Sequence, residues 1–535
     1  MVTVREATWA LMRAHGMTTV FGNPGSTELG FFLGWPADFR YVLGLQESVV
    51  LGLADGYAQA SARPAFVNLH SAVGVGHAMG AIFTAFKNRT PLVITVGQQA
   101  RSILPFDPFL HSAQSTTLPQ PYVKWAVEPA RAADVPHAIA RALHVAMTPP
   151  RGPVLVSVPA DDWAADCAPF AATGPRRVSS ALRPDPSLLG VIGDALDRCR
   201  RPAFVIGPAV DRDGAWPLAR ELAERHRARV YGAPMSGRAG FPEDHPQFGG
   251  WLPSLRERIV EQLAGHDLIL ALGAPAFTYH VQGEGPHAPP GAEVLQIIDD
   301  PQTAAWAPLG TSVIASLGLA IADLLARPLP ASLASRERPP PREPPPPIAE
   351  PAAGERIPVA YLMQTLAALR PRDSIVFEEA PSARPAMQRH LPMLEPGGYY
   401  TMDSGGLGHG LPAAVGVALA ERDKGSGRRV VALVGDGSAM YSIQALWNAV
   451  QLALPMTFVV LRNRRYAALH HFAPYFGFAP GAALPGTELP GLDFCALAAG
   501  HGLQARRVAE GAELAEALRG ALATAGPVLL EVAIA

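Results

Sequence analysis

Cysteine is scarce in this chain of 535 residues, which contains only Cys167, Cys199 and Cys495. Their odd number and wide spacing argue against a disulfide framework and match no metal-binding motif, as is typical of a reducing cytosol. A surplus of either charge is also missing, since the formal net charge is -2 at pH 7 and no basic tract occurs. Nothing in the sequence therefore indicates binding to nucleic acid or to an anionic membrane.

Long apolar runs are missing as well. No stretch of 18 apolar residues occurs, so we expect no membrane span. The first residues, Met1 to Ala10, are polar and helix-like, and they predict that no signal peptide is present. These absences together predict a cytoplasmic protein.

Hydrophobic residues are abundant, at 49% against 17% charged residues, which is typical of a globular protein with much buried surface. A chain of 535 residues is too long for one core, and its length suggests about three domains.

The most informative segment is RRVVALVGDGSAM, from Arg428 to Met440. Its Val and Leu run predicts a strand buried on both faces, as in a parallel sheet. Asp436 then lies at the carboxyl end of that strand, where α/β sheets place their ligands. The stretch from Gly437 to the next strand, PMTFVVLRN, suits one crossover helix, so Asn463 is expected at the neighbouring strand end.

Asp436 and Asn463 both offer oxygen, the ligand that Mg²⁺ prefers, and Mg²⁺ usually bridges to phosphate. Backbone N–H groups at the helix start after Gly437 suit an anion. The alternative is that GDG is only a tight turn, which is common. The oxygen-bearing partner on a second strand end favours the metal and diphosphate interpretation.

The chain repeats itself weakly. AIFTAFKNRTPLVITV, from Ala81, resembles ALWNAVQLALPMTFVV, from Ala445, and GPVLVSVPA at Gly152 resembles GPVLLEVAI at Gly526. The repeat predicts two doubly wound α/β domains of similar topology, one at each end. The alternative is that αβ units converge on similar patterns.

A third α/β segment lies between the repeats, with buried strands expected in RPAFVIGPAV, HDLILALGAPA and EVLQIID. The proline-rich stretch from Glu337 to Gly354 then predicts an extended linker, with a proline-rich partner motif as the alternative. The predicted fold is α/β, with three doubly wound parallel-sheet domains. The predicted bounds are 1–180, 181–336 and 356–535, with the linker at 337–355.

The candidates for chemistry are four residues in polar turns or apolar surroundings: Ser26, Glu47, His70 and His280. Ser26 and Thr27 follow a turn and are expected to cap the next helix, which alone would explain Ser26. Glu47 has apolar neighbours on both sides, which makes a carboxylate costly unless it is paired or protonated. His70 ends a buried strand, at about the position of Asp436 in the other repeat, and a satisfied core histidine is the alternative. His280 follows a strand of the middle segment and is a weaker signal.

The chain resembles the thiamine-diphosphate-dependent decarboxylase superfamily, and within it the benzoylformate decarboxylases. The resemblance covers nearly the whole chain and is strongest in FGNPGSTEL, LQESVVLGLADGYAQAS, NLHSAVG, GAPAFTYH, GGLGHGLPAAVGVALA and GDGSAMYSIQALW. It implies pyrimidine-binding, central and diphosphate-binding domains. It also implies a cofactor held between the first domain of one subunit and the last domain of another, in at least a dimer and typically a homotetramer.

The resemblance also implies roles for individual residues. Glu47 would hydrogen-bond the pyrimidine ring, Ser26 would bind the substrate carboxylate, and His70 and His280 would transfer protons. The metal would be held by Asp436, Asn463 and the main-chain oxygen of Arg465. The remaining cofactor contacts would come from Gly405, Leu407, Gly437, Ser438, Ser382 and Tyr466. The substrate pocket would be formed by Ser26, His70, His280, Thr401, Pro381, Leu469 and Phe472.

Several residues depart from the family's pattern. Arg462-Asn463-Arg464 stands where the family has two asparagines and a glycine, and the two arginines add positive charge near the expected diphosphate. Near the expected substrate, Thr401 replaces an aromatic ring and Pro381 replaces a small hydroxyl residue, while Arg384 and His409 also differ. A reshaped pocket is therefore expected.

The resemblance implies a carboxy-lyase that uses thiamine diphosphate and Mg²⁺. It would decarboxylate an aromatic 2-oxo acid, benzoylformate first, to an aldehyde and CO₂ through a cofactor-bound enamine. One alternative is a carboligase or lyase that uses the same cofactor. Another is a non-catalytic homologue that has lost metal affinity through Arg462 and Arg464.

Overall fold

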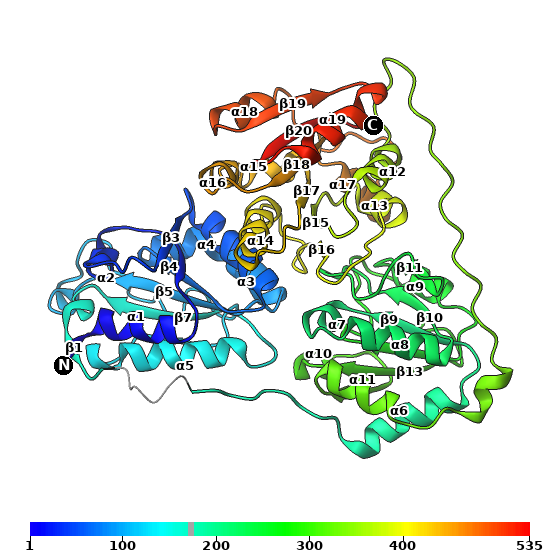
Figure 1. Cartoon of the computed structure of the whole chain (residues 1–535), viewed down its shortest axis with the longest axis horizontal. Helices are drawn as coiled ribbons and strands as arrows, with labels where there is room; N and C mark the ends of the chain where they lie inside the picture. Colours follow the sequence, from blue (N-terminus) through cyan, green and yellow to red (C-terminus); the bar gives the residue numbers. More distant parts are fainter. Residues whose placement is uncertain (170–175) are drawn as a thin grey trace.

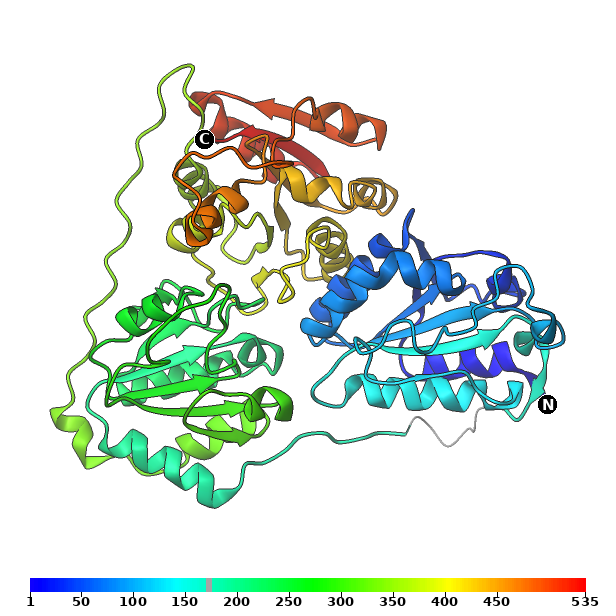
Figure 2. The same ribbon diagram turned by 180° about the vertical axis from the view of Figure 1, so that it is seen from behind.

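The computed structural model describes residues 1–169 and 176–535, and it consists of three α/β domains, each built on a six-stranded parallel sheet (Figures 1 and 2). The predicted fold class is confirmed. The predicted domain boundaries remain predictions, and residues 170–175, at the end of the predicted first domain, lie outside the described residues.

The first domain has the strand order β3-β2-β4-β5-β7-β6. Its Val, Ile and Leu strands are covered by helices on both faces, as their unbroken apolar runs require. A short antiparallel ribbon of β1 (Val2–Thr3) and β8 (Asp166–Cys167) joins its two ends. The remaining elements are α1 (Val4–Ala14), β2 (Thr19–Asn23), the 3₁₀-helix η1 (Ser26–Glu28), α2 (Leu29–Phe32), β3 (Arg40–Leu43), α3 (Glu47–Ser61), β4 (Ala65–Leu69), α4 (Ser71–Lys87), β5 (Leu92–Gln98), η2 (Leu104–Phe106), β6 (Ala126–Val127), η3 (Ala132–Asp134), α5 (Val135–Met147), β7 (Val154–Pro159) and η4 (Asp162–Ala164).

The third domain repeats this topology, with the order β16-β15-β17-β18-β20-β19. Counted along the chain, both sheets read 2-1-3-4-6-5, so the similarity predicted from the internal repeat is confirmed. Its elements are α12 (Val359–Leu369), β15 (Ile375–Glu379), α13 (Arg384–His390), β16 (Tyr399–Tyr400), α14 (Gly410–Lys424), β17 (Val430–Gly435), α15 (Asp436–Met440), α16 (Ala445–Gln451), β18 (Met456–Arg462), α17 (Ala467–Phe472), η6 (Ala473–Phe476), α18 (Phe494–Gly500), β19 (Gln504–Val508), α19 (Gly511–Ala523) and β20 (Val528–Ala533).

The middle domain has the different order β11-β10-β9-β12-β13-β14, which reads 3-2-1-4-5-6 along the chain and is the doubly wound arrangement of dinucleotide-binding folds. The three strands predicted from the sequence are β9, β12 and β13. Its elements are α6 (Pro186–Arg198), β9 (Pro202–Ile206), α7 (Pro208–Arg212), α8 (Trp216–His226), β10 (Arg229–Gly232), β11 (Phe248–Trp251), α9 (Arg256–Gln262), β12 (Leu268–Leu272), β13 (Glu293–Ile298), α10 (Pro301–Ala305), β14 (Thr311–Ile314), α11 (Leu317–Leu325) and η5 (Ala331–Ser335).

The proline-rich stretch after Arg336 contains no helix or strand up to residue 351, because proline supplies no N–H for either. It runs as an extended strap along the outside of the molecule from the middle to the third domain (Figure 1).

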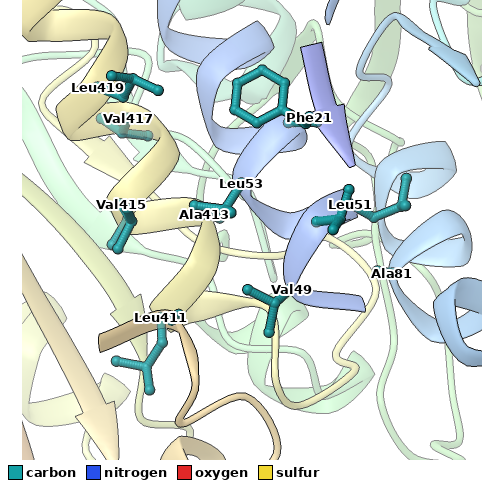
Figure 3. Close-up of a cluster of buried hydrophobic side chains, with 14 of the residues drawn as sticks. Phe21, Val49, Leu51, Leu53, Ala81, Leu411, Ala413, Val415, Val417 and Leu419 are labelled. Carbon is teal, nitrogen blue, oxygen red and sulfur yellow. The ribbon is translucent and has the colours of Figure 1, made fainter. Parts of the chain in front are cut away.

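The first and third domains share one hydrophobic core, formed where α3 packs between α4 and α14 (Figure 3). Glycines allow α3 and α14 to approach at backbone distance. A Cβ on Gly56 would lie 1.9 Å from the Ala413 carbonyl oxygen, and one on Gly416 would lie 2.0 Å from that of Leu53. Buried His409 adds a polar contact between the same two helices, with its Nε2 2.7 Å from a carboxylate oxygen of Asp55. The first and third domains of one chain therefore pack against each other through a shared core.

Candidate active site

Asp436 and Asn463 lie at the carboxyl ends of β17 and β18, which are parallel neighbours. The predicted adjacency of the two strand ends is confirmed. The prediction of a single crossover helix is wrong, because two short helices, α15 and α16, connect the strands. Between them the backbone forms tight i to i+3 hydrogen bonds, such as Ala445 N–H to the Ser442 carbonyl at 3.0 Å, which end one helix before the next begins.

The carboxylate of Asp436 is 3% exposed and makes no ion pair with any described residue. Its oxygens accept backbone N–H groups from Gly437 at 2.9 Å and from Arg464 at 2.6 Å. Burial raises the pKa of Asp436. A cation bound to this carboxylate would offset the desolvation that raises the pKa.

The two unusual arginines occupy different surroundings. Arg462 forms an ion pair at 3.0 Å with Glu531 of the adjacent strand β20, a carboxylate that also pairs with Arg507 at 2.9 Å. Arg464 is exposed and adopts a left-handed backbone conformation with φ +65°, which glycine takes without strain. Its backbone N–H nevertheless reaches Asp436, so the turn keeps its shape despite the substitution.

The turn after Asp436 is compact and buried. The ring of Tyr466 lies against Gly437, where a Cβ would come within 2.4 Å of Tyr466 Cε1. Ser438 follows at 4% exposure, and half-buried Ser382 lies in the turn after β15, the strand next to β17.

The loop that contains Gly405 and Leu407 is held by Glu379, at the end of β15. Its carboxylate accepts the backbone N–H of Gly408 at 2.6 Å and that of Gly410. Burial raises the pKa of Glu379 to about 7. Gly405 itself adopts φ +72° with open space around it, so its backbone is accessible to a ligand.

A cavity of about 710 Å³ opens between the middle and third domains. His280 and Phe472 line it and stack with their ring centroids 4.3 Å apart. Pro381 and Arg384 line it as well, as do residues 342–346 of the proline-rich strap. Of the predicted pocket residues, the cavity therefore brings together His280, Pro381 and Phe472.

Two third-domain residues predicted for the pocket, Thr401 and Leu469, do not line this cavity, and neither do Ser26 and His70 of the first domain. Thr401 is 1% exposed, donates to the Glu378 carbonyl at 2.6 Å and accepts from Arg384 Nη2 at 3.1 Å. Arg384 also pairs with Glu378 at 2.7 Å, so this long side chain covers Thr401. Leu469 lies exposed on α17 outside the lining. Neither residue therefore lies in the wall of this cavity, and their assignment to the substrate pocket stays a prediction.

In the first domain, His70 follows β4 and forms a cluster with the Ser26 turn. Its Nδ1 lies 2.9 Å from Glu28 Oε2 and 3.0 Å from Thr27 Oγ1, which leaves Nε2 for another partner. The predicted capping by Ser26 and Thr27 is wrong, because Ser26 is exposed and the carboxylate of Glu28 accepts the Gly25 N–H at 2.8 Å.

Glu47 is the first residue of α3, and its side chain is 13% exposed. Its carboxylate lies 3.0 Å from His77 Nδ1 on α4 and next to Gly74. It therefore faces α4, and Figure 3 shows α4 and α14 on different sides of α3.

His70 and the Gly405 loop lie at opposite ends of α4 within one chain. Oγ1 of Thr84, near the end of α4, lies 2.9 Å from Oγ of Ser404 in the Gly405 loop, whereas His70 precedes the first residue of the same helix. Fourteen residues of α-helix span about 20 Å. In the described part of the chain, no hydrogen bond or ion pair joins Ser26, Glu47 or His70 to the third domain. One chain thus presents two separate half-sites.

Comparison with known proteins gives matches over most of the chain. Residues 2–119 match the N-terminal TPP binding domain of thiamine pyrophosphate enzymes, residues 191–324 their central domain, and residues 382–532 their C-terminal TPP binding domain. The chain belongs to the thiamine pyrophosphate enzyme family. Thiamine pyrophosphate, also called thiamine diphosphate, is therefore its cofactor.

Individual relatives of this family member are similar over their full length. A benzoylformate decarboxylase of Pseudomonas aeruginosa is 46% identical, with 99% of each chain covered. Among solved structures, a 4-hydroxybenzoylformate decarboxylase of Rhodococcus jostii RHA1 has a TM-score of 0.94 at 42% identity, covering 100% of this chain and 99% of its own. Benzoylformate decarboxylase from Polynucleobacter necessarius has a TM-score of 0.93 at 39% identity, with the same coverage.

The residues of the third domain fit the diphosphate end of this cofactor. Among the described residues, the buried carboxylate of Asp436 has no ion-pair partner. It lies with the Asn463 side chain at the end of the next strand and with a glycine turn, an arrangement that suits a cation and an anion together. Sequence reasoning missed Glu28, His77 and Glu379, each of which contacts a predicted site residue or its loop. The acidic residue in VFGNPGSTE was the one available signal for Glu28.

Proposed function

We propose that this enzyme decarboxylates an aromatic 2-oxo acid, with benzoylformate as the first candidate, to an aldehyde and CO₂. The observation that carries the proposal is the cavity in which His280 stacks on Phe472 beside Pro381. A cavity wall formed by an aromatic ring suits the aryl group of a substrate. The neighbouring histidine suits proton transfer at the reacting carbonyl group. The two decarboxylases named above, which are similar over the full length, support the same reaction.

The residues of the chain would divide the work as follows. Glu47 would hydrogen-bond the pyrimidine ring of the cofactor, and its position at a helix start on a buried face holds the carboxylate in one place. Ser26 would bind the substrate carboxylate. His70 would hold or move a proton at the carbonyl oxygen, oriented by Glu28. His280 would deliver a proton to the carbon that becomes the aldehyde. Bound thiamine diphosphate supplies the electron sink for loss of CO₂.

Mg²⁺ is the metal proposed for the Asp436 site of the third domain. Asp436, the Asn463 side chain and the main-chain oxygen of Arg465 would hold it, because they offer the hard oxygen ligands that this ion prefers. Gly437, Ser438, Ser382 and Tyr466 would surround the diphosphate, and Gly405 and Leu407 would position the cofactor ring. Calorimetric titration with thiamine diphosphate should show binding that requires Mg²⁺, and binding unchanged in EDTA would contradict this assignment.

The functional unit is proposed to be at least a dimer, and a homotetramer as in related enzymes. The separation of the Glu47 and Asp436 half-sites supports this, since a second copy is needed to bring them together.

A cytoplasmic location is proposed from the three cysteines, which are all unpaired. In the described part of the chain, no helix is long and apolar enough to cross a membrane.

A substrate screen tests the reaction. Benzoylformate, 4-hydroxybenzoylformate, a branched-chain 2-oxo acid and pyruvate would each be incubated with the cofactor-loaded enzyme, and CO₂ and aldehyde measured. We expect stoichiometric CO₂ and aldehyde from the aryl substrates and a kcat/KM at least ~10²-fold lower for pyruvate, since a pocket built for a ring loses most of its contacts. Efficient coupling of aldehydes without CO₂ from benzoylformate would replace the proposal by a carboligase.

A further inference from the structure

A second cavity, of about 230 Å³, lies where the three domains meet. Each domain contributes two cationic side chains to its wall. They are Arg89 and Arg151 from the first domain, Arg212 and Arg238 from the middle domain, and Lys424 and Arg428 from the third. Only two acidic residues, Asp211 and Glu421, line it with them. None of these residues belongs to the half-sites described above.

Four of the six cations are matched by a carboxylate. Arg238 pairs with Asp211 at 2.9 Å, Arg212 with Asp299 at 3.1 Å, and Arg89 and Lys424 with Asp300 and Glu421. Their charges are thus compensated by the protein itself. These pairs also fix the wall, because Asp211 accepts the backbone N–H of Gly397 from the third domain at 2.8 Å.

The other two cations have no acidic partner among the described residues. Arg151 is half-buried and makes no hydrogen bond or ion pair there. Arg428 donates only through Nε to the Asp373 carbonyl at 2.7 Å, and its Nη2 is buried without a partner. An unpaired buried guanidinium costs free energy unless an anion meets it. Burial lowers the pKa of Arg151 and the nearby charge of Arg212 lowers it further, while the more distant carboxylates of Asp213 and Asp299, which form no ion pair with Arg151, offset part of this shift.

We propose that this cavity binds a small dianion of the phosphate class, held by the unpaired guanidiniums of Arg151 and Arg428. Guanidinium groups match phosphate oxygens in charge and in fork geometry. Two unmatched positive charges match one phosphate group. The cavity volume is below the ~300–1,000 Å³ of sites for larger ligands, so free phosphate or a small phosphate ester fits better than a nucleotide.

Such an anion would act as a clamp between domains. Arg151 belongs to the first domain and Arg428 to the third, and the wall beside them belongs to the middle domain. Binding therefore stabilises the arrangement of all three domains rather than one of them.

The test uses full-length enzyme saturated with thiamine diphosphate and Mg²⁺, so that phosphate cannot occupy the cofactor site. Inorganic phosphate, glycerol 3-phosphate and, at matched ionic strength, chloride would be titrated by calorimetry and by thermal unfolding. We expect saturable binding of one or both phosphate compounds, a higher Tm with them, and no such effect from chloride. A preference for the ester over free phosphate would identify a metabolite as the ligand, and the reverse would identify the free ion.

Variants assign the binding to the cavity. Arg151→Gln and Arg428→Gln should each weaken phosphate binding about tenfold or more, because one charge-assisted contact is lost. Arg151→Lys should retain more affinity than Arg151→Gln. The matched control Arg519→Gln, at an exposed site on α19, should bind as the parent does. Circular dichroism and activity without phosphate should be unchanged in all of them. The proposal would be overturned if the variant that carries both Arg151→Gln and Arg428→Gln bound phosphate as the parent does. It would also be overturned if chloride raised the Tm as much as phosphate.

Discussion

His280 of the middle domain stacks on Phe472 of the third domain, with ring centroids 4.3 Å apart and planes inclined by 21°. The contact joins two domains at the wall of the proposed substrate cavity and fixes the orientation of the histidine ring. A stacked pair of this kind contributes roughly 0.5–1.5 kcal/mol beyond its buried area.

Replacing Phe472 by alanine should therefore misorient His280. We expect kcat to fall about 2–10-fold from the lost stacking alone, with a further loss if the aryl group of the substrate also packs on this ring. Steady-state kinetics with benzoylformate would measure this. The control is Phe478→Ala, which removes a partly exposed ring a few residues further on and should leave kcat unchanged. Equal kinetics for both variants would refute the orienting role.

His70 and Glu28 provide a second prediction, because the 2.9 Å contact fixes which ring nitrogen faces the substrate. His70→Ala should lower kcat by ~10²–10⁴, the usual contribution of a positioned acid or base. Glu28→Gln should cause a smaller loss of kcat, since an amide can still contact Nδ1 but no longer fixes which ring nitrogen carries the proton. His137→Ala, at an exposed histidine of α5, serves as the control. A normal rate for His70→Ala would exclude its proposed role.

The separation of Glu47 from Asp436 allows a complementation experiment. Glu47→Gln and Asp436→Asn should each inactivate the enzyme. In a mixed dimer, however, one site combines both intact residues and the other combines both substitutions. Random co-assembly should then restore about one-quarter of parental activity, since half of the dimers are mixed and each has one working site of two. If both residues served the same site within one chain, mixing would restore nothing.

Arg464 carries a positive φ that a glycine would adopt without strain. Arg464→Gly should raise the free energy of unfolding by up to about 1 kcal/mol. The substitution relieves the strain of the left-handed conformation, and the larger conformational entropy of glycine in the unfolded chain offsets part of this gain. Arg464→Ala removes the same charge but keeps the strained conformation. Denaturant unfolding of both variants separates the two effects, and an equal stability of Gly and Ala variants would contradict the strain argument. Mg²⁺ titration of both variants beside the parent reports whether the charge of Arg464 affects metal affinity.

Glu243 gives a prediction for pH. Burial raises the pKa of Glu243 to about 8, although its carboxylate accepts the Trp251 N–H at 3.1 Å. Since its folded pKa lies above the unfolded value of about 4.5, the group favours folding when protonated, and this contribution is lost as pH rises from about 4.5 to about 8. Glu243→Gln stays neutral throughout. It should be more stable than the parent at pH 8, by roughly 2–4 kcal/mol, and similar at pH 4.5. Unfolding curves of parent and variant at both pH values check this. A difference in the free energy of unfolding between the two proteins that is the same at pH 4.5 and pH 8 would be the contrary result.

The sequence predicted the buried strands well because unbroken Val and Leu runs specify a position inside a parallel sheet. It also placed Asp436 and Asn463 at neighbouring strand ends, since a short connection between parallel strands leaves few arrangements. The equivalence of His70 and Asp436 was visible for the same reason. Both residues follow the third strand of their sheets, β4 and β17.

Contacts made by tertiary packing could not be predicted in this way. The break between α15 and α16 depends on local turn hydrogen bonds rather than on apolar periodicity. The partners His77 and Glu379 lie on other elements than the residues or loops they hold, so spacing along the chain carries no sign of them. Thr401 was expected in the pocket, but the length of Arg384 and its pairing with Glu378 place it behind another side chain.

The glycine contacts between α3 and α14 have a consequence for how activity arises. Because Gly56 and Gly416 let two backbones touch, the amino- and carboxy-terminal lobes of a subunit move as one rigid unit, and the spacing of their catalytic edges is fixed in advance. In the proposed dimer, docking of an identical subunit would complete both reaction centres in the same event. Dilution should accordingly abolish turnover in step with dissociation, without a species that retains a single competent centre.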